Sequence, residues 1–154
     1  MLRLNLGCAD RHIPGWTNVD IVPPADLISD LSQRWPWDDS TADAIKAEDI
    51  FEHLPDRIHT MNETWRVLRH MGMAEIIVPS AAEGAGFAQD PTHKSAWCAN
   101  SFQYFEHGSF AFERLAKSYG IIGGFRIVSL EKKIYQDKYE PVVKIHVTLQ
   151  AIKL

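Results

Sequence analysis

Two short segments near the start of the chain carry the residue types of a nucleotide-binding site. Apolar residues at positions 2, 4 and 6 lead to Gly7, and a second predicted strand over 17–21 contains Asp20. A glycine at a strand end lets the backbone approach a ligand closely, and a carboxylate on the next strand can accept hydrogen bonds from ribose hydroxyls. The pattern predicts a site for a nucleoside-containing cofactor. Gly7 alone is also typical of any strand end, and Asp20 could instead cap a turn.

A second group of residues could exchange protons with a substrate. His53 precedes a predicted helix, whereas Asp90 and His93 lie in a long polar loop that also contains Lys94. The imidazole of histidine titrates near neutral pH, which suits a general base. For each residue the alternative is a solvated position, at a helix entry for Glu52 and His53 and in a rigid turn for His93. Lys94 has the weakest case.

No metal site is predicted from the spacing of possible ligands. The soft and borderline ligands lack the tight CxxC or HxxxH spacing of typical sites; they are Cys8, His12, His93, Cys98 and His107. Assembly of ligands from distant parts of the chain remains open.

Composition indicates one ordinary globular domain. The 154 residues are 45% hydrophobic and 23% charged, with a net charge of −4. This length predicts a single domain over 1–154 with a sufficient core of its own. The acidic balance argues against nucleic-acid binding, although a local basic patch stays possible.

The location of the protein is expected to be cytoplasmic. No apolar run is long enough to span a membrane, and a strand predicted at the N-terminus leaves no room for a signal peptide. Two cysteines, Cys8 and Cys98, do not suggest a disulfide framework.

Hydrophobic periodicity predicts an α/β fold. Alternating or continuous apolar runs predict strands over 3–7, 17–21, 25–29, 42–47, 73–78, 125–135 and 142–152, and helical spacing predicts helices over 55–68 and 109–119. Gly72 is expected to mark the end of the first helix. The 73–78 strand is nearly all apolar, which predicts a central strand buried on both faces. The last two strands are expected to pair antiparallel.

A series of short motifs runs in one order through the first half of the chain. They are Leu-Asn-Leu-Gly-Cys (4–8), Val-Asp-Ile (19–21), Asp30-Leu31, Trp-Pro-Trp-Asp-Asp-Ser (35–40), Phe-Glu-His-Leu (51–54), Trp-Arg-Val-Leu (65–68) and Ile-Ile-Val-Pro (76–79). With these motifs the chain resembles the class I S-adenosylmethionine-dependent methyltransferases, in particular the small type 11 methyltransferase domain. The resemblance implies a minimal Rossmann-like sheet, mostly parallel, with an antiparallel C-terminal strand pair.

The resemblance also implies S-adenosylmethionine as cofactor and methyl transfer to an oxygen or nitrogen of a small molecule. Asp20 would accept hydrogen bonds from the ribose hydroxyls, and Asp30 from the adenine amino group, although Asp30 could instead be the N-cap of a short helix. The implied cofactor-binding set is Asn5, Gly7, Cys8, Ala9, Arg11, Asp20, Asp30, Leu31, Ala47 and Glu48. If the acceptor is a hydroxyl, His93 is the favoured base and His53 the orienting residue, with Asp90 as another candidate base.

Departures from the family pattern motivate a second hypothesis. The family usually has an acidic residue where Asn5 stands and glycines where Ala9 and Arg11 stand. Arg11 could instead pair with the cofactor carboxylate. The alternative is a non-catalytic cofactor-binding or scaffold protein that keeps the fold. A nicotinamide-dependent oxidoreductase is disfavoured, because the G-x-G-x-x-G glycines are missing.

Short connections predict a homodimer. Only residues 8–16 and 22–24 join the first three strands, whereas a parallel crossover normally takes a dozen or more residues. One sheet face would therefore lack helical cover, and an exposed apolar face usually indicates a partner. Trp16, Trp35 and Trp37 are possible contributors to that interface. For Trp35 and Trp37, stacking on adenine is the other reading, and core or subunit packing is favoured.

Overall fold

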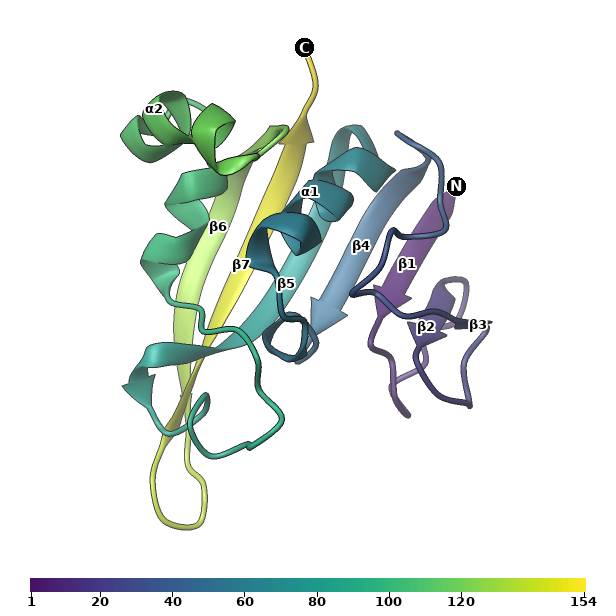
Figure 1. Ribbon diagram of the computed structural model, residues 1–154. Coiled ribbons are helices and arrows are strands. Elements are labelled where there is room, and N and C mark those ends of the chain that lie inside the picture. Colours follow the sequence, from purple (N-terminus) through teal and green to yellow (C-terminus); the bar gives the residue numbers. More distant parts are fainter.

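Seven strands form one mixed sheet in the computed structural model, which describes residues 1–154 (Figure 1). Their bounds are β1 Leu2–Leu6, β2 Thr17–Asp20, β3 Leu27–Ile28, β4 Ala42–Glu48, β5 Leu68–Gly84, β6 Gly124–Tyr135 and β7 Val142–Ile152. The spatial order is β3-β2-β1-β4-β5-β7-β6. β1 to β5 are parallel, and β7 pairs antiparallel with both β5 and β6. The predicted fold class is confirmed.

Two helices begin and end close to their predicted positions. Asp56 caps α1 (Arg57–Val67), because its side chain accepts hydrogen bonds from the first backbone N–H groups of the helix. Ser109 caps α2 (Phe110–Tyr119) in the same way. Gly120 ends α2 with a φ of +77°, a conformation that glycine adopts without strain. Two 3₁₀ segments, η1 (Phe51–His53) and η2 (Ala99–Phe105), complete the structure.

The start of β5 differs from the prediction. Leu68 already has an extended conformation and pairs with Ala42, so β5 follows α1 directly. Gly72 consequently lies inside β5, and the predicted helix end at this residue is wrong. Residues that follow Val67 pair with β4 and β7 as a strand, although their apolar spacing alone suggested a longer helix.

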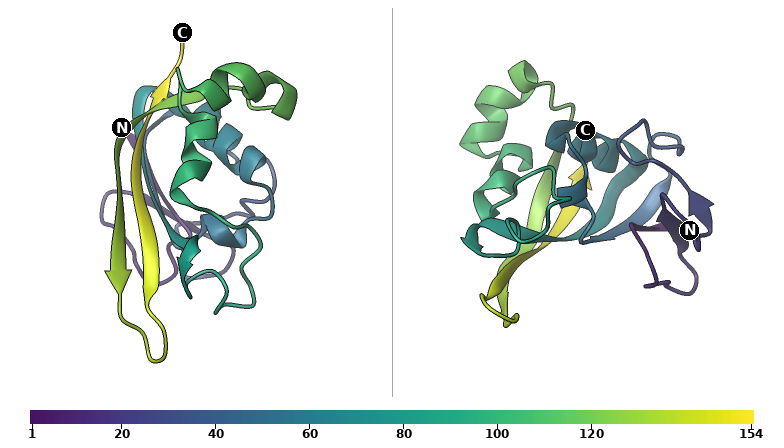
Figure 2. Two further views of the ribbon diagram at one scale, coloured as in Figure 1. Left: turned by 90° about the vertical axis from the view of Figure 1, so that its left-hand side faces the viewer. Right: turned by 60° about the horizontal axis from the view of Figure 1, so that its bottom comes forward.

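All helices lie on one side of the sheet, as the left view of Figure 2 shows. One row of paired positions faces them and is apolar throughout: Val19, Leu6, Ala47, Ile76, Val147 and Leu130. The first five of these side chains are buried, and Leu130 packs partly buried against the same core. The expected loss of helical cover over the other face is confirmed, because the 7–16 and 21–26 connections contain no helix.

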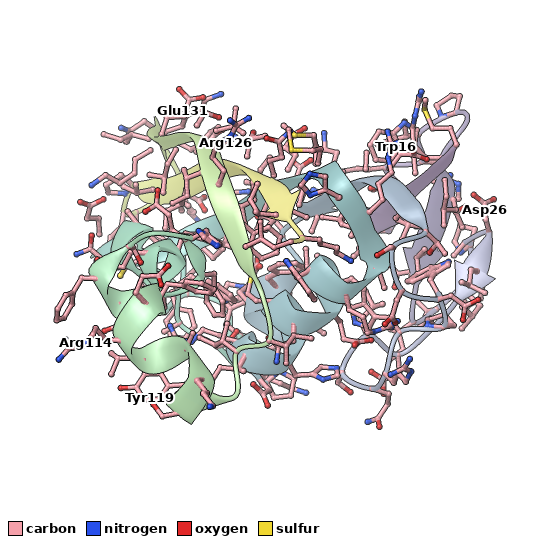
Figure 3. The ribbon with its side chains drawn as sticks, turned by 90° about the horizontal axis from the view of Figure 1, so that it is seen from above. Trp16, Asp26, Arg114, Tyr119, Arg126 and Glu131 are labelled. Atoms are coloured by element: carbon pink, nitrogen blue, oxygen red, sulfur yellow. The ribbon has the colours of Figure 1, made fainter.

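The uncovered face is polar, contrary to the expected apolar surface. The neighbouring row of paired positions carries Asn18, Asn5, Lys46, Glu75, Thr148 and Ser129. Lys46 lies 3.8 Å from a carboxylate oxygen of Glu75 across the strands. Figure 3 shows Arg126 and Glu131 on this side of the sheet, opposite Arg114 and Tyr119 of α2. The connection after β1 buries the two asparagines, whereas Lys46, Glu75, Thr148 and Ser129 are exposed or half-buried without a covering layer, so β5 is central but not apolar on both faces.

Because this sheet face is polar, it offers no apolar surface for the predicted homodimer to bury. Trp35 is 1% exposed and lies beside α1, where its backbone N–H donates to Glu63. Trp37 packs edge-on against it, with ring centroids 6.3 Å apart. Both tryptophans belong to the helix-covered side, as the core reading predicted, and cannot cover the other face. Trp16 does lie on the uncovered side (Figure 3). The homodimer itself stays a prediction.

None of the helices combines the length and apolar character needed to cross a membrane.

Candidate functional site

The carboxyl ends of the parallel strands meet at one edge of the sheet, where β1 and β4 point downward in Figure 1. A cavity of about 250 Å³ opens there. Its walls are formed by Gly7, Asp20, Ile21, Ser29, Asp30, Leu31, Ser32, Ile50, His53, Leu54, Pro55 and Lys94. This edge is where ligands bind in open α/β sheets. Four residues of the predicted cofactor set and the predicted His53 therefore share one cavity.

Asp20 occupies the wall at the end of β2. One carboxylate oxygen accepts a hydrogen bond from the Ala9 N–H at 2.8 Å, and the other accepts from the Ile21 N–H at 2.7 Å. Ala9 has a φ of +44°, in the left-handed region that glycine favours. Asp20 thus organises the turns on both sides of it and also faces the cavity. A carboxylate has about four acceptor positions, so it retains capacity for a ligand.

Asp30 combines the two readings that the sequence left open. The backbone N–H and the hydroxyl of Ser32 donate to the same Asp30 oxygen, at 2.9 and 2.7 Å. These hydrogen bonds hold the pKa of Asp30 below its ordinary value. Asp30 caps a turn rather than a helix, and it lines the cavity next to the buried Leu31.

Gly7 has a structural reason to be glycine. Its φ is +62°, and a Cβ at this position would lie 2.6 Å from the Cβ of Ile50. Both the left-handed backbone and the contact exclude a larger residue. The close approach expected at Gly7 is therefore made by the side chain of Ile50, which also lines the cavity.

Six residues of the predicted cofactor set lie outside the cavity walls: Asn5, Cys8, Ala9, Arg11, Ala47 and Glu48. Arg11 is engaged with the protein, because its guanidinium donates to the Glu48 carbonyl at 2.9 Å and lies 3.5 and 3.6 Å from the carboxylates of Glu48 and Asp49. It does not face the cavity as a free partner for a carboxylate.

Asn5 has a role in holding the loop after β1. Its amide N–H groups donate to the Arg11 carbonyl and to the Asn18 side chain, each at 2.8 Å. The same Asn18 oxygen accepts from the Ile13 N–H. These amides fix the nine-residue connection that replaces a crossover helix. A carboxylate at position 5 could not donate either bond.

The predicted catalytic residues come together beside the cavity. The rings of His53 and His93 are nearly perpendicular, with centroids 4.8 Å apart. The Nδ1 atom of His93 lies 2.8 Å from the Phe87 carbonyl, and its Nε2 atom lies 3.5 Å from an Asp90 carboxylate oxygen. Only 8% of the His93 side chain is exposed, so the reading of His93 as a solvated loop residue is wrong. His53 lines the cavity and His93 does not.

Thr92 connects His53 to Asp90. The Thr92 hydroxyl donates to Asp90 at 2.7 Å, and the Nδ1 atom of His53 lies 3.2 Å from the same hydroxyl oxygen. Because the single hydroxyl proton is used on Asp90, neutral His53 donates through Nδ1 and keeps its lone pair on Nε2. The hydrogen bonds from Thr92 also lower the pKa of Asp90.

Glu52 is a buried carboxyl group that the sequence placed at the surface. The residue is 1% exposed, its Oε2 atom has no hydrogen-bond partner, and burial raises its pKa from an ordinary 4.5 to about 8. The 3₁₀ turn directs Glu52 inward, and the backbone N–H groups of Lys94 and Ser95 close over it by donating to its carbonyl at 2.7 and 3.0 Å. No local pattern indicates this, because the covering residues, Lys94 and Ser95, lie far along the chain from Glu52.

Two more findings concern residues that the spacing had not brought out. Lys94, the weakest candidate, lines the cavity.

Glu52, His53 and His93 each offer one possible metal-ligand atom, and these atoms lie within 4.8 Å of one another. The distant assembly of ligands that the sequence left open is thus present, with only His93 among the ligands first considered.

A larger groove of about 570 Å³ lies between α1, η2 and the end of α2. Its walls include Arg57, Cys98, Tyr104, Phe105 and Tyr119. None of the predicted site residues belongs to it, so the smaller cavity at the strand ends is the candidate active site.

Comparison with known proteins identifies the fold. No protein-family model matches the chain, and no curated protein matches its sequence. A SAM-dependent methyltransferase from Archaeoglobus fulgidus is similar in structure, at 14% identity and a TM-score of 0.64, over 96% of this chain and 85% of that one. The 1,6-didemethyltoxoflavin-N1-methyltransferase of Burkholderia thailandensis, solved with its substrate and S-adenosylhomocysteine, gives 14% identity and a TM-score of 0.60, over 99% and 71%.

The [4+2]-cyclase SpnF is also similar, at 15% identity and a TM-score of 0.66, over 97% of this chain and 74% of that one. The chain therefore has the class I methyltransferase fold. Because a cyclase shares this fold, the reaction has to be argued from the site.

Proposed function

We propose that this chain binds S-adenosylmethionine in the cavity at the strand ends and transfers its methyl group to an oxygen or nitrogen of a small molecule. The observation that carries the proposal is the convergence of Gly7, Asp20 and Asp30 in one cavity. These residues follow or end three successive strands of a methyltransferase fold, in the order that the resemblance implies.

The cavity residues fit the parts of such a cofactor. Asp20 would accept hydrogen bonds from the ribose hydroxyls with its remaining lone pairs. Asp30 would accept a hydrogen bond from the adenine amino group. Ile21 and Leu31 supply apolar wall beside them. A volume of about 250 Å³ is slightly below the roughly 300–1,000 Å³ of most small-molecule sites. The cavity is open to solvent, so a larger cofactor would extend past its walls.

The protein has a limited chemical task in this reaction. When bound, the cofactor supplies a methyl group already activated for displacement, so the chain has to align the acceptor and take up a proton. His53 lines the cavity, and in its neutral form Nε2 is the atom that can accept that proton. His93 packs against the His53 ring and lies outside the cavity walls. We therefore assign the base to His53 and a positioning role to His93, which reverses the roles expected from the sequence.

The alternative is a protein that binds the cofactor without turnover. Arg11 favours it, because this side chain is paired with Glu48 and Asp49 instead of facing the cavity. A sample that binds S-adenosylhomocysteine but methylates no oxygen or nitrogen acceptor from a broad library would support this alternative.

Calorimetry with S-adenosylhomocysteine tests the shared premise of cofactor binding. Asp20→Asn removes the carboxylate charge and one acceptor, and we expect a loss of about 1–3 kcal/mol in binding free energy. Asp10→Asn is the matched control, since Asp10 is exposed and lies on the connection between β1 and β2, outside the cavity walls. No binding by the wild type, or equal affinities for all three proteins, would reject the assignment of the cavity.

A further inference from the structure

We propose that Glu52, His53 and His93 form a binding site for a divalent first-row transition-metal ion. The three residues offer ligand atoms within 4.8 Å of one another, and two of them come from η1 whereas the third comes from the loop after β5. Zinc–nitrogen distances of about 2.0–2.1 Å in tetrahedral sites imply ligand separations of roughly 3.3 Å. The distances between ligand atoms, at most 4.8 Å now, would have to shorten by up to about 1.5 Å, which rotations of the side chains can supply.

The hydrogen bonding of His93 prepares it as a ligand. Its Nδ1–H donates to the Phe87 carbonyl at 2.8 Å, which leaves the lone pair of the neutral ring on Nε2. That atom faces carboxylate oxygens of Asp90 at 3.5 Å and Glu52 at 4.0 Å. A proton or a metal ion between these electron-pair donors would remove their mutual repulsion, and a metal ion would be bound by all of them at once. Metal-bound histidines almost always donate their other N–H to a carbonyl or carboxylate, as His93 does.

Glu52 provides an independent indication of a missing partner. Its Oε2 atom is buried without any hydrogen-bond donor, in a residue that is 1% exposed. Buried polar atoms are nearly always paired, and an unpaired one needs a specific explanation. A metal ion bound by this carboxylate would supply the partner. The backbone of Glu52 is fixed by the N–H groups of Lys94 and Ser95, which donate to its carbonyl oxygen.

The donor set selects the class of ion. Two imidazoles with one carboxylate form the protein ligands of catalytic zinc sites and of non-haem iron(II) sites, and both leave coordination positions open. Magnesium and calcium prefer sites made of oxygen ligands. Asp90 lies next to the cluster, 3.5 Å from His93. The Thr92 hydroxyl hydrogen-bonds to both Asp90 and His53, so the proposed ligands have hydrogen-bond partners of their own.

The position of the ion would change one catalytic role. His53 belongs both to the cluster and to the cavity wall, so the ion would lie at the edge of the cavity. A bound ion lowers the pKa of a coordinated hydroxyl. On the function proposed above, and only if that function holds, an acceptor oxygen would bind the ion and His53 would serve as a ligand rather than as a base.

Titration of the metal-stripped full chain with Co²⁺, followed by visible absorption, tests the proposal directly. We expect saturable binding of one ion per chain, with the intense bands of a four- or five-coordinate site, and displacement by Zn²⁺. Glu52→Gln keeps the shape of the side chain and should weaken binding at least about 100-fold, as should His93→Ala, since loss of outer-layer partners alone costs 10–100-fold. His107→Ala is the control, because His107 is exposed and outside the cluster.

Three results would overturn the proposal: no saturable binding of Co²⁺ or Zn²⁺, equal binding by the cluster variants and the control, or weak octahedral bands that indicate adventitious surface binding. Circular dichroism of each variant checks that it is folded, and the isosteric Glu52→Gln keeps the test valid if His93→Ala unfolds. Calorimetry of the same metal-free chain with S-adenosylhomocysteine is a separate measurement. Failure of metal binding and failure of cofactor binding are therefore distinguishable.

Discussion

The buried carboxyl group of Glu52 should make the stability of this protein depend on pH. Burial raises its pKa from 4.5 to about 8, so the folded state binds its proton more tightly than the unfolded state does. The difference of about 3.5 between the two pKa values, at about 1.4 kcal/mol for each pH unit, corresponds to about 5 kcal/mol at the high-pH limit.

The direction follows from which state holds the proton. Below pH 4.5 both states are protonated, and Glu52 does not lower the free energy of unfolding. As the pH rises from 4.5 to 8, the unfolded chain loses the proton while the folded chain keeps it, so stability falls with pH. We expect Glu52 to account for a loss of about 3 kcal/mol between pH 5 and pH 8.

Urea unfolding of the wild type and of Glu52→Gln at several pH values measures this contribution. Both proteins are kept in a chelator, so that no metal ion holds the carboxylate ionised. The variant has no proton to lose at position 52, so its stability relative to the wild type should rise by about 3 kcal/mol from pH 5 to pH 8. Taking this difference removes the pH dependence that the two proteins share. Glu75→Gln is the control, because Glu75 is exposed on the uncovered sheet face. A constant difference between Glu52→Gln and the wild type would refute the buried, protonated carboxyl group.

Three further predictions concern the fold. Gly7→Ala should lower the free energy of unfolding by more than the roughly 1–3 kcal/mol typical of backbone strain alone, because the new Cβ would meet Ile50. Gly15→Ala is the control, since Gly15 has a φ of +78° but nothing within 4 Å of an added Cβ, and it should show only the strain. Equal urea midpoints for the two variants would contradict this. Arg66→Met should lower the free energy of unfolding, measured in urea, by about 3–5 kcal/mol. The substitution leaves Glu63 buried without the guanidinium that now donates to both its carboxylate oxygens at 2.7 Å. Adding Glu63→Gln should recover part of the loss. Light scattering at micromolar concentration tests the homodimer: a dimer mass would confirm it, and a monomer mass would agree with a sheet face that is polar enough to meet water unaided.

The polar sheet face could have been predicted from local sequence. Leu2-Arg3-Leu4-Asn5-Leu6 alternates strictly, and Ile45-Lys46-Ala47-Glu48 alternates in the same way. Alternation of apolar and polar residues is typical of a sheet with one wet face. The homodimer argument relied on connection lengths instead, and these correctly predicted the missing helices but not the chemistry of the surface they leave open.

The cavity was partly predictable for a related reason. Gly7, Asp20 and Asp30 stand at strand ends, and parallel strands bring their carboxyl ends to one edge whatever the loops do. The side chains of Asn5 and Arg11 could not be placed in this way. Asn5 is used for loop closure and Arg11 for ion pairing, and both roles depend on partners that only the folded connection brings near.

The sequence by itself determined the order of strands and helices, the apolar core face and the strand-end residues, because these follow from periodicity and from the geometry of parallel strands. Only the tertiary structure decided the surroundings of Glu52, His53 and His93. Glu52 is buried because the backbone at residues 94 and 95 closes over η1, and His93 meets His53 because the same loop returns to the edge of the sheet. Contacts between segments far apart in the chain set the pKa of Glu52 and gather the ligands of the proposed metal site, and no local pattern of residues encodes such contacts.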